Sequence, residues 1–105
     1  MVTAALNRDQ VIERLRGVGP QILGLGVHRL ALFGSIVRGE GRPESDTDFL
    51  VEFAPGQKSF DRFLALSDLL EELLGRPVEL VTTEALSPYI GPHILAEAAD
   101  VLRAA

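Results

Sequence analysis

Two carboxylates open an apolar stretch near the middle of the chain, where Asp46-Thr47-Asp48 precedes the residues "FLVEF". In an extended backbone, side chains at positions i and i+2 lie on one face, with Cα atoms about 6.6 Å apart. Two aligned carboxylates repel each other, and a divalent cation is the simplest compensation. Mg²⁺ prefers oxygen ligands and commonly binds through one or two carboxylates together with substrate phosphates. Asp46 and Asp48 therefore predict a metal site, with one ion or with two ions about 3.5–4 Å apart.

The pair Gly34-Ser35 ends the preceding apolar run, ten residues before Asp46. A glycine that leaves a strand lets the backbone turn sharply and lets a ligand approach closely. If Ser35 starts a helix, the free N–H groups there and the serine hydroxyl make an anion site suited to phosphates. The two motifs together indicate that this region holds opposite ends of a metal–nucleotide complex.

A third carboxylate, Glu79, interrupts the apolar segment "VELV". If this segment pairs as a strand beside the strand of Asp48, neighbouring Cβ atoms lie about 4.5–5.5 Å apart. Glu79 would then be a metal ligand or the base that deprotonates an attacking hydroxyl. The alternative is that Glu79 simply faces solvent on a half-exposed strand.

The elements that would position these residues follow from hydrophobic spacing and from capping residues, glycine and proline. Asn7 and Gln10 form a capping-box pattern at the start of a first helix, which should end or kink near Pro20. Further along the chain we expect strands at 28–33, 48–53 and 78–82. We expect a short helix at 35–40 and a longer helix from Ser59 to Leu74. A last helix should begin near Pro92, with Ile94, Ala98 and Val101 on its apolar face. Tyr89, the only tyrosine, is expected to pack in the core or in a loop. This order predicts an α+β fold, with helices packed on a small mixed β-sheet.

Length and composition favour one domain over residues 1–105. The formal net charge of −5 argues against direct binding of nucleic acid, because such binding rests on Lys and Arg that neutralise phosphates. The chain has no cysteine, which excludes disulfides and thiolate metal sites. It shows no secretory signal and no apolar stretch near the ~18 residues of a membrane span. We therefore expect a cytoplasmic protein without a membrane partner.

The combined pattern resembles the minimal nucleotidyltransferases, the MNT proteins of the DNA polymerase β-like superfamily. The superfamily pattern is Gly-Ser, ten residues, then Asp-x-Asp, as found here. The segment "SIVRGEGRPESD" also matches the MNT habit of Arg-Gly after the serine and Ser-Asp before the aspartate pair. The segment "GRPVELVTTEAL" is similar to the strand that carries the family's third carboxylate. The resemblance covers nearly the whole chain.

This resemblance implies a role for each site residue. Gly34 and Ser35 would hold the triphosphate of the nucleotide, and Arg38 would help to hold the phosphates or the loop. Mg²⁺ would be bound by the carboxylates of Asp46, Asp48 and Glu79. One departure concerns Glu79, because the family usually has aspartate at the third carboxylate. The additional methylene either still reaches the metal or disturbs the geometry of the base.

The resemblance also implies an activity and a partner. Many MNT proteins of this length are antitoxins of a HEPN-type ribonuclease toxin, which they modify with AMP from ATP on a tyrosine or block by complex formation. The first hypothesis is a Mg²⁺-dependent nucleotidyltransferase that moves AMP, or another NMP, from an NTP to a hydroxyl of a protein partner. The alternatives are a non-catalytic antitoxin and an aminoglycoside-type transferase acting on small molecules, for which a homo-oligomer could build the missing wall of the site. The sequence leaves open the nucleotide base, the acceptor and the stoichiometry.

Overall fold

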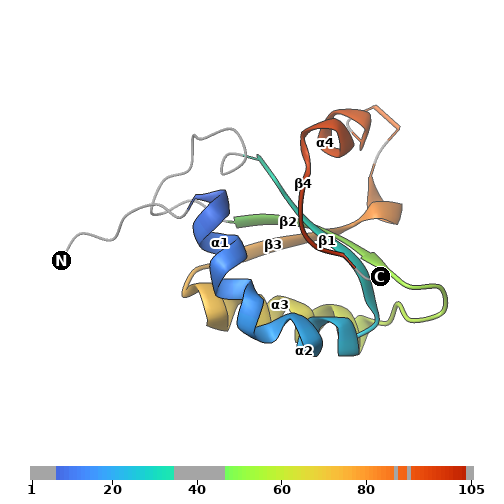
Figure 1. The fold of residues 1–105 in the computed structure, drawn as a ribbon. Helices are drawn as coiled ribbons and strands as arrows, with labels where there is room; N and C mark the ends of the chain where they lie inside the picture. Colours follow the sequence, from blue (N-terminus) through green and yellow to red (C-terminus); the bar gives the residue numbers. More distant parts are fainter. Residues whose placement is uncertain (1–6, 35–46, 87, 90, 104–105) are drawn as a thin grey trace.

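The structure is a computed structural model that describes residues 7–34, 47–86, 88–89 and 91–103. Its helices and strands, with 3-10 turns labelled η, are α1 (Arg8–Leu15), η1 (Arg16–Val18), α2 (Gly19–Gly24), β1 (Val27–Phe33), β2 (Thr47–Phe53), α3 (Phe60–Leu74), β3 (Val78–Thr82), η3 (Thr83–Ala85), α4 (Gly91–Glu97) and β4 (Ala99–Arg103). In this part of the chain, the strands form one sheet in the order β3-β2-β1-β4. β1 pairs antiparallel with β2 and with β4, whereas β2 and β3 are parallel. The predicted α+β fold with a small mixed sheet is confirmed (Figure 1).

The first helix begins where the capping pattern predicted. Asn7 Oδ1 accepts a hydrogen bond from the Gln10 N–H at 2.8 Å, and Gln10 Oε1 accepts one from the Asn7 N–H at 2.9 Å. This reciprocal pair satisfies two N–H groups at the helix start. The helix then gives way to η1 and to α2, whose first turn contains Pro20, so the predicted break is confirmed.

The long third helix also begins and ends at the predicted residues. Ser59 Oγ accepts a hydrogen bond from the Arg62 N–H at 3.2 Å and caps the start of α3. Gly75 follows the last helical residue with φ of 68°, the left-handed conformation in which glycine commonly ends a helix. Along α3, Leu66 and Leu70 are fully buried against the sheet.

Helices α1, α2 and α3 cover one face of the sheet, whereas α4 lies away from them beside the start of β4 (Figure 1). Because strand side chains alternate between faces, every second strand residue joins this core. The core residues are Val11, Leu15, Ile22, Val27, Leu30, Leu32, Phe49, Val51, Phe53, Leu66, Leu70 and Leu74. The residues between them on the strands, including Phe33 and Asp48, lie on the opposite face, which we call the second face. No helix in the described segments is long and apolar enough to cross a membrane.

The chain ends in a strand where the sequence predicted only a helix. α4 stops at Glu97, and the next residues pair with β1 as β4, so the expected helical face through Val101 is wrong. The alignment of Ala99 with Leu32 is a long-range contact that local spacing does not reveal. The expectation for Tyr89 is also wrong, because this residue is 88 % exposed. The short helix expected at 35–40 lies outside the described residues.

Candidate active site

Gly34 ends β1 in a conformation and a contact that both require glycine. Its φ is +79°, in the left-handed region that L side chains rarely adopt. A Cβ atom at this position would lie 2.2 Å from Oδ2 of Asp48 and 3.1 Å from its Cγ. The carboxylate of Asp48 therefore lies directly against the backbone of Gly34. The glycine of the Gly-Ser pair and the second aspartate of the Asp-x-Asp pair are brought together.

Glu79 lies beside Asp48 on the neighbouring strand. Asp48 is aligned with Phe33 on β1 and with Glu79 on β3. Partners in a sheet direct their side chains to the same face, so both carboxylates belong to the second face, away from the α1–α3 core. The conditional prediction that the strand of Glu79 pairs beside that of Asp48 is confirmed. Asp48 is half-buried and Glu79 is exposed, so Glu79 is open to an incoming group.

A further carboxylate that sequence reasoning missed joins this cluster. The Gly34 N–H donates a hydrogen bond of 2.7 Å to Oε1 of Glu97, the last residue of α4. Glu97 was overlooked because the chain was expected to continue as a helix past this point. The available signal was the short segment "ADVLR", which begins two residues after Glu97 and whose pattern fits a strand as well as a helix.

The other predicted site residues, Ser35, Arg38 and Asp46, lie outside the described residues. Among the described residues, no group of three His, Asp or Glu side chains is arranged to hold a metal ion. The carboxylates of Asp48 and Glu79 are nevertheless hard oxygen donors of the kind that Mg²⁺ takes in proteins. The donor chemistry of these two carboxylates thus fits Mg²⁺.

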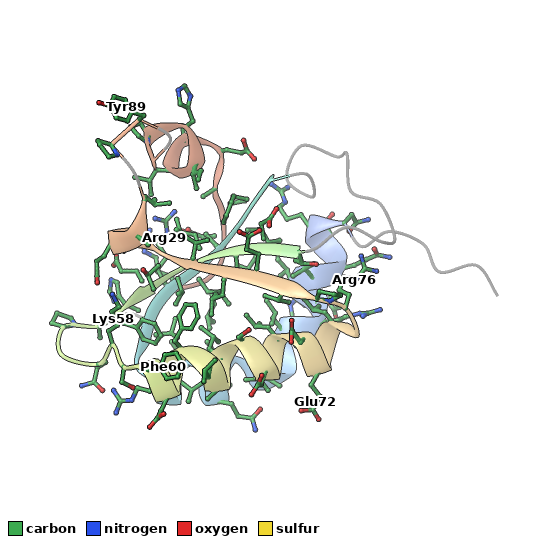
Figure 2. The ribbon with its side chains drawn as sticks, turned by 180° about the vertical axis from the view of Figure 1, so that it is seen from behind. Arg29, Lys58, Phe60, Glu72, Arg76 and Tyr89 are labelled. Atoms are coloured by element: carbon green, nitrogen blue, oxygen red, sulfur yellow. The ribbon has the colours of Figure 1, made fainter. Side chains whose placement is uncertain are left out.

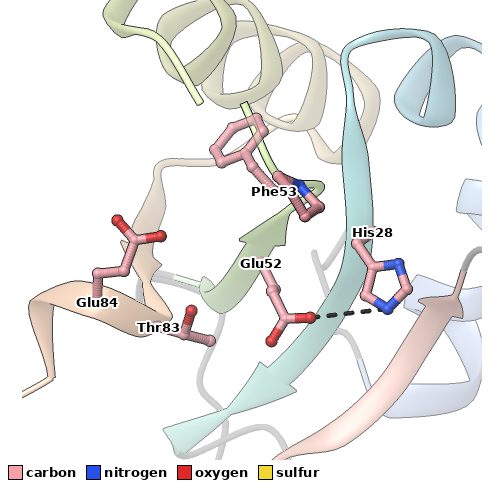
Figure 3. A pocket seen from close by; sticks show the side chains of 6 residues that line it. His28, Glu52, Phe53, Thr83 and Glu84 are labelled. Atoms are coloured by element: carbon pink, nitrogen blue, oxygen red, sulfur yellow. Dashed lines mark ion pairs between the residues drawn. The ribbon is translucent and has the colours of Figure 1, made fainter. Parts of the chain in front are cut away.

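A separate hollow lies at the other end of the second face, about four residues further along β2 (Figure 3). Its volume is about 560 Å³, and its lining comes from His28, Glu52, Phe53, Pro55, Thr83 and Glu84. A β-bulge in β1 places both His28 and Arg29 opposite Glu52, and His28 Nε2 lies 3.7 Å from Glu52 Oε1. On the far side, Glu84 forms a 2.6 Å ion pair with Lys58. The carboxylates of this hollow thus lie beside the side chains of His28 and Lys58 and apart from Asp48.

Comparison with known families identifies the class of protein that has this arrangement of residues. A mixed sheet that carries a glycine turn at the end of one strand and carboxylates on the next two fits a nucleotidyltransferase site. The family model described as the nucleotidyltransferase domain matches residues 12–101. The chain belongs to this nucleotidyltransferase family.

Similar proteins agree with the family. A candidate protein adenylyltransferase of Methanocaldococcus jannaschii is 41 % identical over 90 residues, which cover 86 % of this chain and 96 % of the relative. A solved structure described as a candidate minimal nucleotidyltransferase is 36 % identical with a TM-score of 0.69, covering 84 % of this chain and 93 % of the other. A solved structure of a tri-AMPylated HEPN toxin of Shewanella oneidensis with its MNT antitoxin matches with a TM-score of 0.57 at 20 % identity. That match covers 91 % of this chain and 69 % of the other, and it shows likeness of fold alone.

Proposed function

We propose that this chain is a protein adenylyltransferase that depends on Mg²⁺ and transfers AMP from ATP to a hydroxyl of a HEPN-type toxin, acting as its antitoxin. The observation that carries the proposal is the position of Asp48 between Gly34 on β1 and Glu79 on β3. The candidate adenylyltransferase from M. jannaschii supports the reaction, because it is similar to this chain over almost its whole length. The AMPylated HEPN toxin in complex with an MNT antitoxin suggests the partner.

The transfer forms one bond and breaks another. The toxin hydroxyl oxygen attacks the α-phosphorus of ATP in line, the bond to the β-phosphate oxygen breaks, and pyrophosphate leaves. Mg²⁺, when bound, neutralises the charge that develops on the phosphate oxygens. Asp46, Asp48 and Glu79 would hold it.

Residues of the chain would also bind the triphosphate and accept the proton of the attacking hydroxyl. Gly34 and Ser35 would bind and orient the triphosphate, with help from Arg38. Glu79 would take the proton of the attacking hydroxyl, since its carboxylate is exposed beside Asp48 and open to an incoming acceptor.

The decisive experiment combines the protein, the product of the gene beside its own, Mg²⁺ and α-labelled ATP, followed by a denaturing gel. We expect label on the partner with the wild-type chain and none with Asp48→Asn, because the amide cannot supply the anionic metal ligand. Label that persists at the wild-type level with Asp48→Asn would contradict the assigned site.

A non-catalytic antitoxin is the second candidate. It is favoured by Glu79, whose side chain is one methylene longer than the usual aspartate and is exposed at the strand edge. In that case the toxin is silenced by a stable complex without nucleotide, no label is transferred, and Asp48→Asn protects against the toxin as well as the wild type does.

A further inference from the structure

The carboxylate of Glu97 lies beside Gly34 and has no role in the proposed reaction. Its Oε1 accepts the 2.7 Å hydrogen bond from the Gly34 N–H, across 63 residues of sequence. A separation of 2.7 Å is typical of strong bonds between an N–H and an ionised carboxylate. The donor belongs to the same residue whose Cα lies against Asp48. Glu97 thus acts on the backbone of the candidate site, and it does so from a different element.

The pairing of β1 with β4 explains how Glu97 reaches this point. Leu32 is aligned with Ala99 in an antiparallel pair. Gly34 follows Leu32 by two residues, just beyond the end of β1, and Glu97 precedes Ala99 by two residues, at the end of α4. The register of the two strands therefore brings this carboxylate opposite the Gly34 turn.

Two features of the fold lie close to the Glu97 carboxylate. Glu97 is the last residue of α4, where the free carbonyl groups of the helix disfavour a negative charge. In addition, Oδ2 of Asp48 lies 2.2 Å from the position of a Gly34 Cβ, so standard backbone dimensions place the two carboxylates within about 7 Å of each other. This short separation places the Glu97 carboxylate beside the candidate site.

We propose that Glu97 is a positioning residue of the nucleotide site. Its carboxylate fixes the left-handed turn of Gly34, which keeps the backbone against Asp48. On this view Gly34 helps to orient the triphosphate through its conformation, because its N–H is occupied by Glu97. The inference rests on the proposed nucleotidyltransferase function and adds a residue to it.

Two substitutions separate this role from a general effect of charge. Glu97→Ala removes the acceptor, whereas Glu97→Gln keeps a side-chain oxygen that can accept the Gly34 N–H. Glu72→Ala is the charge control, because Glu72 is exposed on the outer surface of α3, away from the sheet (Figure 2). The measurements are the dissociation constant of ATP with Mg²⁺, the KM for ATP in the transfer reaction, and hydrogen exchange of the Gly34 amide by NMR.

We expect Glu97→Ala to weaken ATP binding and to raise the KM by roughly ten- to a hundredfold, the scale of a small misplacement in an active site. The Gly34 amide should exchange faster in the same variant. Glu97→Gln should recover most of the ATP affinity, and Glu72→Ala should match the wild type.

Three results would overturn the inference. Tighter ATP binding in both Glu97 variants would show that the carboxylate competes with the phosphates. Unchanged ATP affinity in Glu97→Ala, with faster exchange of the Gly34 amide, would show a structural contact only. Wild-type protein that fails to bind ATP with Mg²⁺ would overturn the proposed function and this inference together, whereas the first two results overturn the inference alone.

Discussion

Asp48 and Gly34 lie so close that no side chain fits between them, since a Cβ atom on Gly34 would lie 2.2 Å from Asp48 Oδ2. The contact lies between the end of β1 and the start of β2. In the sequence, these two points are separated by the ten-residue spacing of the nucleotidyltransferase pattern. The contact makes Gly34 a determinant of where the Asp48 carboxylate is held. The first prediction follows from this contact.

Gly34→Ala should abolish nucleotidyl transfer and lower the free energy of unfolding. An alanine at a φ of +79° costs about 1–2 kcal/mol, and the collision with Asp48 adds about 1–3 kcal/mol of overpacking. Gly56→Ala is a matched control, because Gly56 has a φ of +76° but nothing within 4 Å of an added Cβ. Gly56→Ala should lower the free energy of unfolding only by the conformational cost of the left-handed backbone, and it should keep full transfer activity. Equal losses in the two variants, measured by urea unfolding and by labelling, would contradict the importance of the Asp48 contact.

Glu79→Gln should lower the transfer rate by about 10²–10⁴, the usual contribution of a general base. The fold should be unaffected, because Glu79 is exposed and belongs to a strand edge rather than to the core. Glu79→Asp restores the residue typical of the family and should retain activity or raise it. The measurement is the single-turnover rate of AMP transfer, with circular dichroism to confirm folding.

A different result for Glu79 would change its assignment. If Glu79→Gln transfers AMP at the wild-type rate, Glu79 is neither base nor essential metal ligand, and the carboxylates of Asp46 and Asp48 suffice.

Removal of divalent metal should stop transfer and leave the complex with the toxin intact. The physical reason is that Asp48 and Glu79 are aligned neighbours whose carboxylates are the oxygen donors that would hold the metal beside the triphosphate. Saturating Mg²⁺ and ATP, at 100 times their dissociation constant, should stabilise the wild-type chain by about 2.7 kcal/mol. A thermal shift measured with and without a chelator checks this, and Asp48→Asn should show little shift. An equal shift in Asp48→Asn would place the metal elsewhere.

The sequence predicted most of the fold because its signals are local. The capping pair Asn7 and Gln10 and the glycine after α3 mark helix ends, and each acts within a few residues. The alignment of Asp48 with Glu79 could be anticipated as well, because two apolar strands separated by one helix favour parallel pairing. Glu97 was not anticipated, since its place depends on β4, a short strand whose local pattern fits a helix equally well and which pairs with Leu30 and Leu32 on β1. The missed strand and the missed site residue are therefore one error.

The buried hydroxyl of Thr47 yields the last prediction, which concerns stability. Thr47 separates the two aspartates of the motif, is fully buried, and its Oγ1 has no hydrogen-bond partner within the described part of the chain. A buried hydroxyl without a partner costs about 1–3 kcal/mol, so Thr47→Val should raise the free energy of unfolding by roughly 1 kcal/mol. For a domain of this size the melting temperature should rise by about 4–8 °C.

Thr82→Val is the control for Thr47, because Thr82 lies on the same face of the neighbouring strand and keeps 8 % exposure. Its hydroxyl is not among the buried groups that lack a partner, so its replacement should leave stability unchanged or lower it. If both variants raise the melting temperature equally, the gain comes from added apolar surface at the sheet. If Thr47→Val alone lowers the melting temperature, the Thr47 hydroxyl has a hydrogen-bond partner. That hydrogen bond then holds the start of β2 and the position of Asp48.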